Sequence, residues 1–275
     1  MRQFVLAVGQ WRVVHETETN LDRAETFLRE ASAAGASMCL LPEMFQTPYD
    51  TTILRQRAEA PDGPSLGRIR NLARELSMYI VAGSICEQLG DHVCNSSYVF
   101  GPDGQTLGVH RKIHLFDVYF EDLCVEESTV ISAGDRPLVI RTPLCTLGVA
   151  ICYDVRFPEV FRYFEEKGVE VALLPAAFSK PTGEAHWHLV MRTRAVDHQI
   201  YLAAACPSSD PTAPFVTYGH SLIVDPWGNV LAEAGDSDEN ISVSLSPEFL
   251  DRVRNRLPAL AHRRRRLYKT WFVEE

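Results

Sequence analysis

The sequence lacks the features that mark three specialised classes of protein. Its seven cysteines are odd in number, irregularly spaced and without a Cys-x-x-Cys pair, which argues against a disulfide framework and a structural zinc site. No apolar run approaches the ~18 residues of a transmembrane helix, so no membrane association is expected. Basic residues are not in excess: 27 Lys and Arg stand against 36 Asp and Glu, which argues against nucleic-acid binding through a basic face.

Two further observations predict the cellular compartment. Residues 1–10 are too short for a signal peptide and contain no cleavage site. Several cysteines lie within apolar runs, where a free cysteine packs as a small hydrophobic residue. We therefore expect a cytoplasmic protein in a reducing environment, and any cysteine with a chemical role must be recognised from its neighbours.

The chain of 275 residues has the composition of an ordinary globular protein, with 46% hydrophobic and 23% charged residues. Its predicted helices and strands fall into two similar halves. In the first half, periodicity predicts strands at 4–10, 37–41 and 78–86, helices at 20–34 and 64–77, and a hairpin over 94–111. The second half is predicted to have strands at 147–151, 169–174 and 200–206, helices at 158–167 and 184–198, and a hairpin over 221–232. A long ordered loop is expected at 113–135, and a helix with a basic tail after residue 246.

The two halves also share residues. Leu-Leu-Pro-Glu-Met-Phe at 40–45 matches Leu-Leu-Pro-Ala-Ala-Phe at 173–178, and the two hairpins match at four positions. Each half needs helices on one face of its sheet and a partner on the other face. The pattern therefore predicts an α/β fold in which both halves pack sheet on sheet, as a four-layer α-β-β-α sandwich forming one domain over residues 1–275.

Three reactive residues end or follow predicted strands: Glu43, Lys112 and Cys152. In α/β sheets, sites gather at the carboxyl ends of strands. Glu43 could accept the thiol proton of Cys152, and Lys112 could stabilise a developing oxyanion. Taken singly, each residue has a structural explanation as a loop carboxylate, a solvated base or a core thiol. A papain-like Cys–His protease is the enzyme alternative, but the local sequence around Cys152 does not fit that class.

The segments around these residues resemble the nitrilase superfamily of carbon–nitrogen hydrolases. They read Leu-Leu-Pro-Glu at 40–43, His-Arg-Lys-Ile-His-Leu-Phe-Asp at 110–117 and Gly-Val-Ala-Ile-Cys-Tyr-Asp-Val-Arg-Phe-Pro-Glu at 148–159. The resemblance implies Glu43 as general base, Lys112 as oxyanion stabiliser and Cys152 as nucleophile of a thioester mechanism without cofactor or metal. It also implies the four-layer sandwich, a homodimer or higher homo-oligomer, and a second glutamate, which aligns with Glu127 rather than its neighbour Glu126.

Within the superfamily the chain is most similar to the omega-amidase branch, through the segments at 182–187, 192–197 and 218–221. This likeness implies hydrolysis of the terminal amide of small dicarboxylate monoamides such as 2-oxoglutaramate and 2-oxosuccinamate. The chain lacks the usual Pro-Gly in the loop after the lysine motif, and Ala133 replaces a usual proline. Deaminated-glutathione amidase and N-carbamoyl amine or amino-acid hydrolase are therefore alternatives, and an inactive interaction subunit is the non-enzyme alternative.

Such a substrate would be a small amide bearing a carboxylate, which calls for local positive charge. Arg156, four residues after Cys152, is the candidate for pairing with that carboxylate, although an ion pair with Asp154 or Glu159 would also explain it. Tyr153 is expected to offer its backbone N–H to the oxyanion. Tyr49 and Thr182 are further candidates for lining the substrate pocket.

Two other patterns are assigned structural roles. His186 and His188 are two residues apart on a predicted helix and do not share a face, so they are a poor metal site. The run of four arginines at 263–266 is interpreted as a solvated or subunit-interface helix end rather than an anion-binding tail.

Overall fold

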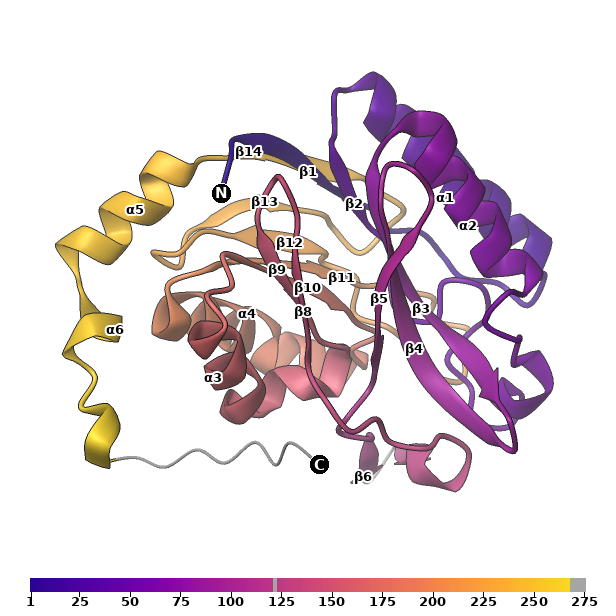
Figure 1. The fold of residues 1–275 in the computed structure, drawn as a ribbon. Helices are drawn as coiled ribbons and strands as arrows, with labels where there is room; N and C mark the ends of the chain where they lie inside the picture. Colours follow the sequence, from indigo (N-terminus) through magenta and orange to yellow (C-terminus); the bar gives the residue numbers. More distant parts are fainter. Residues whose placement is uncertain (121–122, 268–275) are drawn as a thin grey trace.

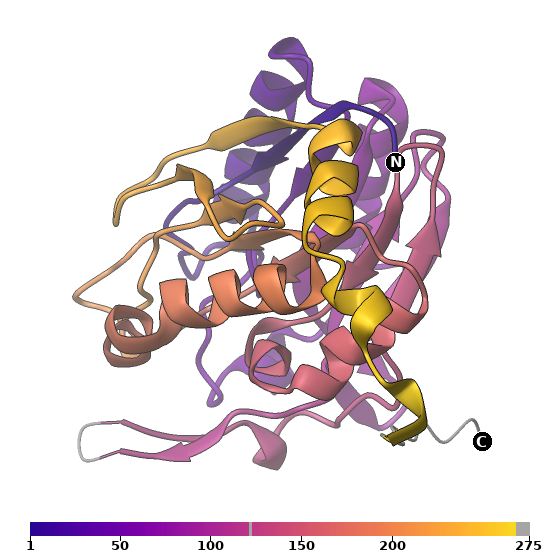
Figure 2. The same ribbon diagram turned by 90° about the vertical axis from the view of Figure 1, so that its left-hand side faces the viewer.

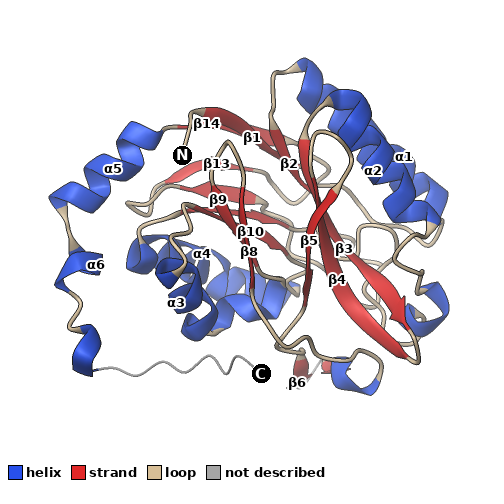
Figure 3. Cartoon of the chain, viewed as in Figure 1, coloured by secondary structure: helices blue, strands red, loops and turns tan. Residues whose placement is uncertain are grey.

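The computed structural model describes residues 1–120 and 123–267, which contain two six-stranded sheets packed face to face (Figures 1 and 3). The first sheet has the order β14 (Ile241–Leu245), β1 (Phe4–Val8), β2 (Met38–Leu40), β3 (Tyr79–Leu89), β4 (His92–Phe100) and β5 (Thr106–Arg111). The second has the order β13 (Val230–Glu233), β12 (Leu222–Val224), β11 (Tyr201–Ala205), β10 (Val171–Pro175), β9 (Thr146–Val149) and β8 (Leu138–Arg141).

Alternating side chains build the core between the sheets. Leu6 and Val8 of β1 point into this core, where they belong to one cluster with Val149 of β9 and Leu173 of β10. Ala7 between them faces the other way and packs in the cluster beneath the helices. This period-two pattern, with both faces buried, explains why the strands read as continuous apolar runs in the sequence.

Helices cover the two outer faces. α1 (Thr17–Ala33) and α2 (Pro64–Leu76) pack on the first sheet, whereas α3 (Pro158–Glu166) and α4 (Lys180–His198) pack on the second (Figure 1). The predicted four-layer α-β-β-α sandwich is therefore confirmed. The chain also contains short 3₁₀ turns: η1 (Leu54–Arg57), η2 (Glu127–Thr129), η3 (Cys152–Arg156) and η4 (Arg265–Leu267).

The C-terminal segment returns to the first half of the chain. β14 pairs antiparallel with β1, so a strand that follows the second half completes the first sheet. α5 (Pro247–Arg256) and α6 (Ala259–His262) then run along one side of the molecule (Figure 2). Arg263, the first residue of the arginine run, forms an ion pair of 2.9 Å with Glu165 on α3. That pair ties the start of the arginine run to α3, a contact within the chain that the sequence did not predict.

Several boundaries differ from the prediction. α1 begins at Thr17, and Asn20 lies inside it, where its buried side chain bonds the backbone of Val14 and Gln46 instead of capping the helix. α4 begins at Lys180, four residues early, because Pro181 suits a first helical turn. The loop at 113–135 contains a short hairpin of β6 (Asp117–Tyr119) and β7 (Cys124–Glu126). Among the described residues no helix is long and apolar enough to cross a membrane.

Candidate active site

Strand ends from both sheets bring the reactive residues together. Glu43 follows β2, Lys112 follows β5 and Cys152 follows β9, while Glu127 opens η2 after the β6–β7 hairpin. β2 and β5 run in the same direction, so their carboxyl ends lie at one edge of the first sheet. The side chains of Glu43, Lys112 and Glu127 are almost fully buried, and Cys152 is 7% exposed.

The backbone around two of these residues is strained. Cys152 has a φ of 45° and Met44, next to Glu43, a φ of 51°. Positive φ in a residue other than glycine costs on the order of 1–3 kcal/mol, and such residues concentrate at functional sites. Gly83 makes the second turn possible, because a Cβ there would lie 2.0 Å from the carbonyl oxygen of Pro42.

Lys112 lies between two carboxylates. Its Nζ is 3.1 Å from Oε1 of Glu43, and it is 3.0 and 2.8 Å from the two oxygens of Glu127. The negative charges of these two buried carboxylates stabilise the ammonium form of Lys112. The lysine therefore stays charged, and the carboxylates are held where they can take part in proton transfer.

Two donors that sequence reasoning missed hold these carboxylates. The side-chain amide of Asn95 on β4 donates to Glu43 at 2.7 Å and to Glu127 at 3.3 Å. The backbone N–H of Phe116 donates to Glu127 at 2.7 Å. The only signal in the sequence was a polar residue near the start of the hairpin predicted over 94–111. Glu126, the neighbour of Glu127, points away and accepts a hydrogen bond from the hydroxyl of Tyr119 at 2.6 Å.

The electrostatics keep the thiol protonated at rest. Burial raises the pKa of Cys152 well above its usual value, the charge of Glu43 raises it further, and Lys112 opposes both. Burial and the charge of Glu127 also raise the pKa of Glu43 against the effect of Lys112. Burial lowers the pKa of Lys112, but the two glutamates outweigh it and raise that pKa well above its usual value.

Glu43 has one oxygen free for the thiol proton. Oε1 is bound by Asn95 and Lys112, whereas Oε2 is buried and has no hydrogen-bond partner among the described residues. The thiol of Cys152 lies next to this carboxylate and to the backbone N–H of Ala177. A carboxylate with raised basicity beside a buried thiol is the arrangement that general-base activation of a nucleophile requires.

Asp154 joins the lysine segment to the cysteine turn. Its buried carboxylate accepts hydrogen bonds from the backbone N–H groups of Ile151 and His114 and contacts ring nitrogens of His110 and His114 at 2.9 and 2.8 Å. Burial would raise the pKa of Asp154, but the hydrogen bonds of both histidines lower it well below its usual range. Asp154 is therefore an anion that ties residues 110–114 to η3.

A pocket adjoins Cys152 and includes all four predicted substrate-binding residues. Its lining consists of Tyr49, Phe116, Cys152, Tyr153, Arg156, Ala177, Phe178, Ser179 and Thr182. The hydroxyl of Tyr49 is buried and has no hydrogen-bond partner among the described residues. The ring of Tyr49 also lies 5.6 Å from Nζ of Lys112, so this side chain contacts both the pocket and the buried charges.

Arg156 does not form the ion pair that was the alternative explanation for it. Asp154 is occupied by the two histidines, and no carboxylate among the described residues pairs with Arg156. Its guanidinium instead lies over the rings of Tyr153 and Phe178, at 5.8 and 5.3 Å, and 3.4 Å from Nδ1 of His186. A cation without a counter-ion thus faces the pocket beside Cys152.

His186 and His188 diverge, as their spacing predicts. His186 contacts Arg156, whereas Nε2 of His188 lies 2.8 Å from a carboxylate oxygen of Glu233. His188 does meet a second histidine there, His220, which comes from the segment before β12. The spacing of His186 and His188 keeps these two residues apart but has no bearing on the distance between His188 and His220.

Comparison with known proteins assigns the family. The carbon-nitrogen hydrolase family model matches residues 5–254. The chain belongs to the carbon–nitrogen hydrolase family. It is 40% identical to "Omega-amidase NIT2" of Danio rerio over 100% of both chains, and 39% identical to "Omega-amidase NIT2" of Homo sapiens over 98% of both. The crystal structure of Saccharomyces cerevisiae Nit3, a member of branch 10 of the nitrilase superfamily, superposes with a TM-score of 0.90 at 35% identity, covering 96% of this chain and 97% of that one. The resemblance seen in the motifs is confirmed.

The contact between Glu127 and Lys112 predicts a loss of activity when Glu127 is changed, and a change of the neighbouring Glu126 is the control. In this carbon–nitrogen hydrolase, Glu127→Gln removes a charge that holds Lys112, so kcat should fall by about 10–100-fold, the usual effect of losing a residue that orients an active group. Glu126→Gln changes the same residue type one position earlier, at an exposed site, and should leave kcat within twofold. Steady-state kinetics of both variants check this. Equal losses in both would contradict the role given to Glu127.

Proposed function

We propose that this carbon–nitrogen hydrolase is an omega-amidase, which hydrolyses the terminal amide of small dicarboxylate monoamides such as 2-oxoglutaramate. The observation that supports this most directly is Arg156, a cation with no carboxylate partner among the described residues, on the lining of the pocket that holds Cys152. A substrate with a carboxylate at one end and an amide at the other would supply the missing counter-ion while the amide reaches the thiol.

The first half-reaction forms a thioester. Glu43 takes the proton of the Cys152 thiol as the thiolate attacks the amide carbonyl carbon. Lys112 and the backbone N–H of Tyr153 stabilise the oxyanion of the tetrahedral intermediate. Glu43 then gives the proton to the departing nitrogen, the C–N bond breaks and ammonia leaves. The raised pKa of Glu43 suits both steps, because the same group must accept and return one proton.

The second half-reaction releases the acid. A water molecule in the place vacated by ammonia gives a proton to Glu43 and attacks the thioester carbonyl. The tetrahedral intermediate collapses with cleavage of the C–S bond, and the proton on Glu43 returns to the sulfur. Glu127 keeps Lys112 in position throughout and Asn95 keeps Glu43 in position, since each pair is hydrogen-bonded.

The beginning of α4 supports the binding of an anion in the same pocket. Ser179 and Thr182 stand at this helix N-terminus, with their hydroxyl oxygens 2.9 Å apart, and both line the pocket. The helix dipole favours negative charge at such a terminus. The carboxylate would therefore lie between Arg156 and Thr182.

Arg156→Ala tests this placement. We expect KM for 2-oxoglutaramate to rise by about 10–100-fold with little change in kcat, because a charged hydrogen-bonded pair contributes ~1.5–3 kcal/mol. KM for an uncharged amide of similar length should change less than threefold. Arg162→Ala, which removes an arginine paired with Glu165 on α3, is the matched control. A comparable rise in KM for both substrates would count against the proposal.

A substrate panel decides between the alternatives. Ammonia release would be measured from 2-oxoglutaramate, 2-oxosuccinamate, deaminated glutathione, an N-carbamoyl amino acid and a nitrile, with Cys152→Ala as the blank. The proposal requires the highest kcat/KM for one of the two ω-amides. A preference for deaminated glutathione or for the carbamoyl compound would support the corresponding alternative activity instead. No ammonia release from any substrate would support an inactive interaction subunit.

We also propose that the protein is cytoplasmic and forms a homo-oligomer. Light scattering of the purified protein tests the oligomeric state.

A further inference from the structure

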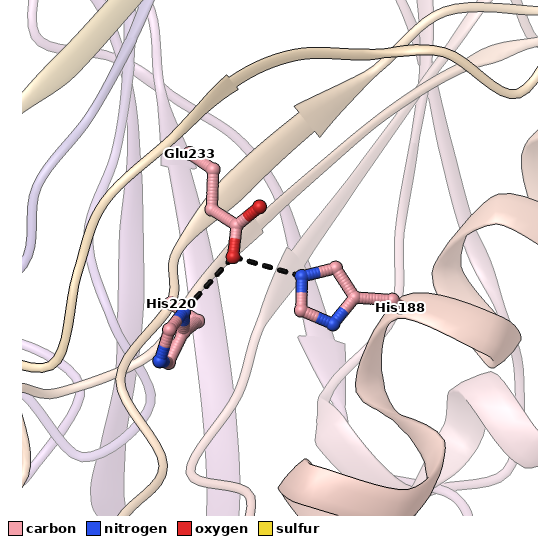
Figure 4. Close-up of side chains that lie close together, drawn as sticks. All are labelled: His188, His220 and Glu233. Carbon is pink, nitrogen blue, oxygen red and sulfur yellow. Dashed lines mark hydrogen bonds and ion pairs between the residues drawn. The ribbon is translucent and has the colours of Figure 1, made fainter.

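Three potential metal ligands from separate segments meet on the second half of the molecule. They are His188 on α4, His220 just before β12 and Glu233 at the end of β13 (Figure 4). Nε2 of His188 and Nδ1 of His220 lie 2.8 and 2.9 Å from the same oxygen of Glu233, and all three ligand atoms are within 4.8 Å of one another. None of the three lines the pocket at Cys152.

The donor set fits a transition-metal ion. Two imidazoles and one carboxylate form a zinc site with a fourth position open for water. Zinc–nitrogen and zinc–oxygen bonds of about 2.0–2.2 Å require tetrahedral ligand atoms to be roughly 3.3–3.5 Å apart. The observed 2.8 and 2.9 Å are shorter by about half an ångström, a shift that the exposed side chain of Glu233 can provide.

His220 is held in place before any ion binds. It has a φ of 54°, its N–H donates to the carbonyl oxygen of Gly235 at 2.9 Å, and its own carbonyl oxygen accepts the indole N–H of Trp187 at 2.7 Å. Its ring stacks on Tyr218, with centroids 4.3 Å apart. A strained residue fixed from both sides presents a ligand at a defined position, as tight metal sites require.

The surroundings are negative and reachable from solvent. The three side chains are between 30% and 37% exposed, so an ion has a path to them. Glu184 lies one turn before His188 on α4, and its negative charge adds to that of Glu233. Negative charge of this kind favours the binding of a dication.

We propose that His188, His220 and Glu233 bind a divalent transition-metal ion, with Zn²⁺ preferred over Mg²⁺ because two of the three ligands are imidazoles. The ion joins α4 to the β12–β13 hairpin. α4 begins at the wall of the substrate pocket, and Gly183 in its first turn packs so closely on Tyr218 that a Cβ there would lie 2.2 Å from the ring. Binding therefore strengthens the contact that holds this wall, at a distance from the thiol chemistry.

Zinc titration of the EDTA-treated full chain tests the proposal. We expect one site per chain by isothermal titration calorimetry, a raised melting temperature with Zn²⁺ and neither effect with Mg²⁺. His188→Ala and Glu233→Gln should each weaken Zn²⁺ binding at least ~10-fold, since even residues behind a ligand contribute 10–100-fold. Glu233→Gln keeps a hydrogen-bond acceptor of the same shape, so it separates metal ligation from a mere hydrogen-bond network.

Two controls exclude other ligands. His186→Ala removes the neighbouring histidine on the same helix and should leave Zn²⁺ affinity unchanged. Cys152→Ala removes the thiol of the candidate active site and should also retain the ion. Co²⁺ should give a visible spectrum free of the thiolate-to-metal charge-transfer band. Failure to bind Zn²⁺ at concentrations up to about 100 μM would overturn the proposal, because structural sites bind this ion far more tightly. Binding that is lost in Cys152→Ala but kept in His188→Ala and Glu233→Gln would also overturn it.

Discussion

Cys152→Ala should abolish amide hydrolysis, with kcat/KM falling by on the order of 10⁴ or more, as for other covalent nucleophiles. Its thiol alone among those of the described residues both lines the substrate pocket and lies beside a free carboxylate oxygen. Without the thiol no thioester forms, and water has no activated path to the amide. Rates of ammonia release over a range of 2-oxoglutaramate concentrations measure the loss in kcat/KM, and the melting temperature shows whether the fold is retained.

Cys124→Ser is the matched control for this loss. Cys124 is exposed on β7, outside the pocket, and its removal should leave kcat/KM within twofold. Mass spectrometry of acid-quenched wild-type protein should detect the acyl group of the substrate bound to the protein as a thioester. This adduct should be missing in Cys152→Ala and present in Cys124→Ser. Retained turnover in Cys152→Ala would refute the mechanism.

Glu43→Gln should lower kcat by about 10²–10⁴-fold, the range of a general base. The amide keeps a partner for Asn95 and the size of the side chain, but it cannot accept the thiol proton. Alkylation of Cys152 by iodoacetamide should slow in parallel, because thiolate formation depends on the same transfer. A variant that loses turnover but keeps the alkylation rate would assign Glu43 a role other than base.

The pH dependence of kcat/KM in the wild-type protein is expected to follow the ionisation of Glu43. Burial and Glu127 raise the pKa of Glu43, and only its ionised form accepts a proton. The acid limb of kcat/KM should therefore lie above the pKa of ~4.3 of an ordinary glutamate. Glu87→Gln is the control, because Glu87 is a buried carboxylate bound to Arg111 outside the pocket. It should lower the melting temperature without moving the acid limb, and an unshifted limb in wild-type protein would contradict the prediction.

Local sequence patterns determined much of the architecture. The apolar runs around Val8, Leu40 and Leu173 were recognisable as buried strands because almost every side chain on them is covered on one face or the other. The match between 40–45 and 173–178 predicted two packed sheets because neither half can cover its own sheet. The motifs placed Glu43, Lys112 and Cys152 on strand ends, where an α/β fold gathers its reactive groups.

Contacts between distant segments were decided by the tertiary structure. Asn95 holds two glutamates 52 and 32 residues away, and nothing near it in the chain marks that role. β14 joins β1 across more than 230 residues, so its partner could not be read from local periodicity. Arg156 could be assigned to a substrate only after Asp154, its nearest candidate partner, was found bound to histidines from another strand end.

The histidines and cysteines also show which properties follow from the sequence and which follow only from the tertiary structure. Sequence spacing alone determined that His186 and His188 cannot share a ligand, because a helix turns them apart. Only the folded chain brings His188 to His220 and Glu233, since helix, loop and strand meet there in three dimensions. Likewise, seven thiols are equivalent in composition, and Cys152 differs because two sheets bury it beside a base. Periodicity records which face of an element is covered, whereas chemistry depends on which distant groups cover it.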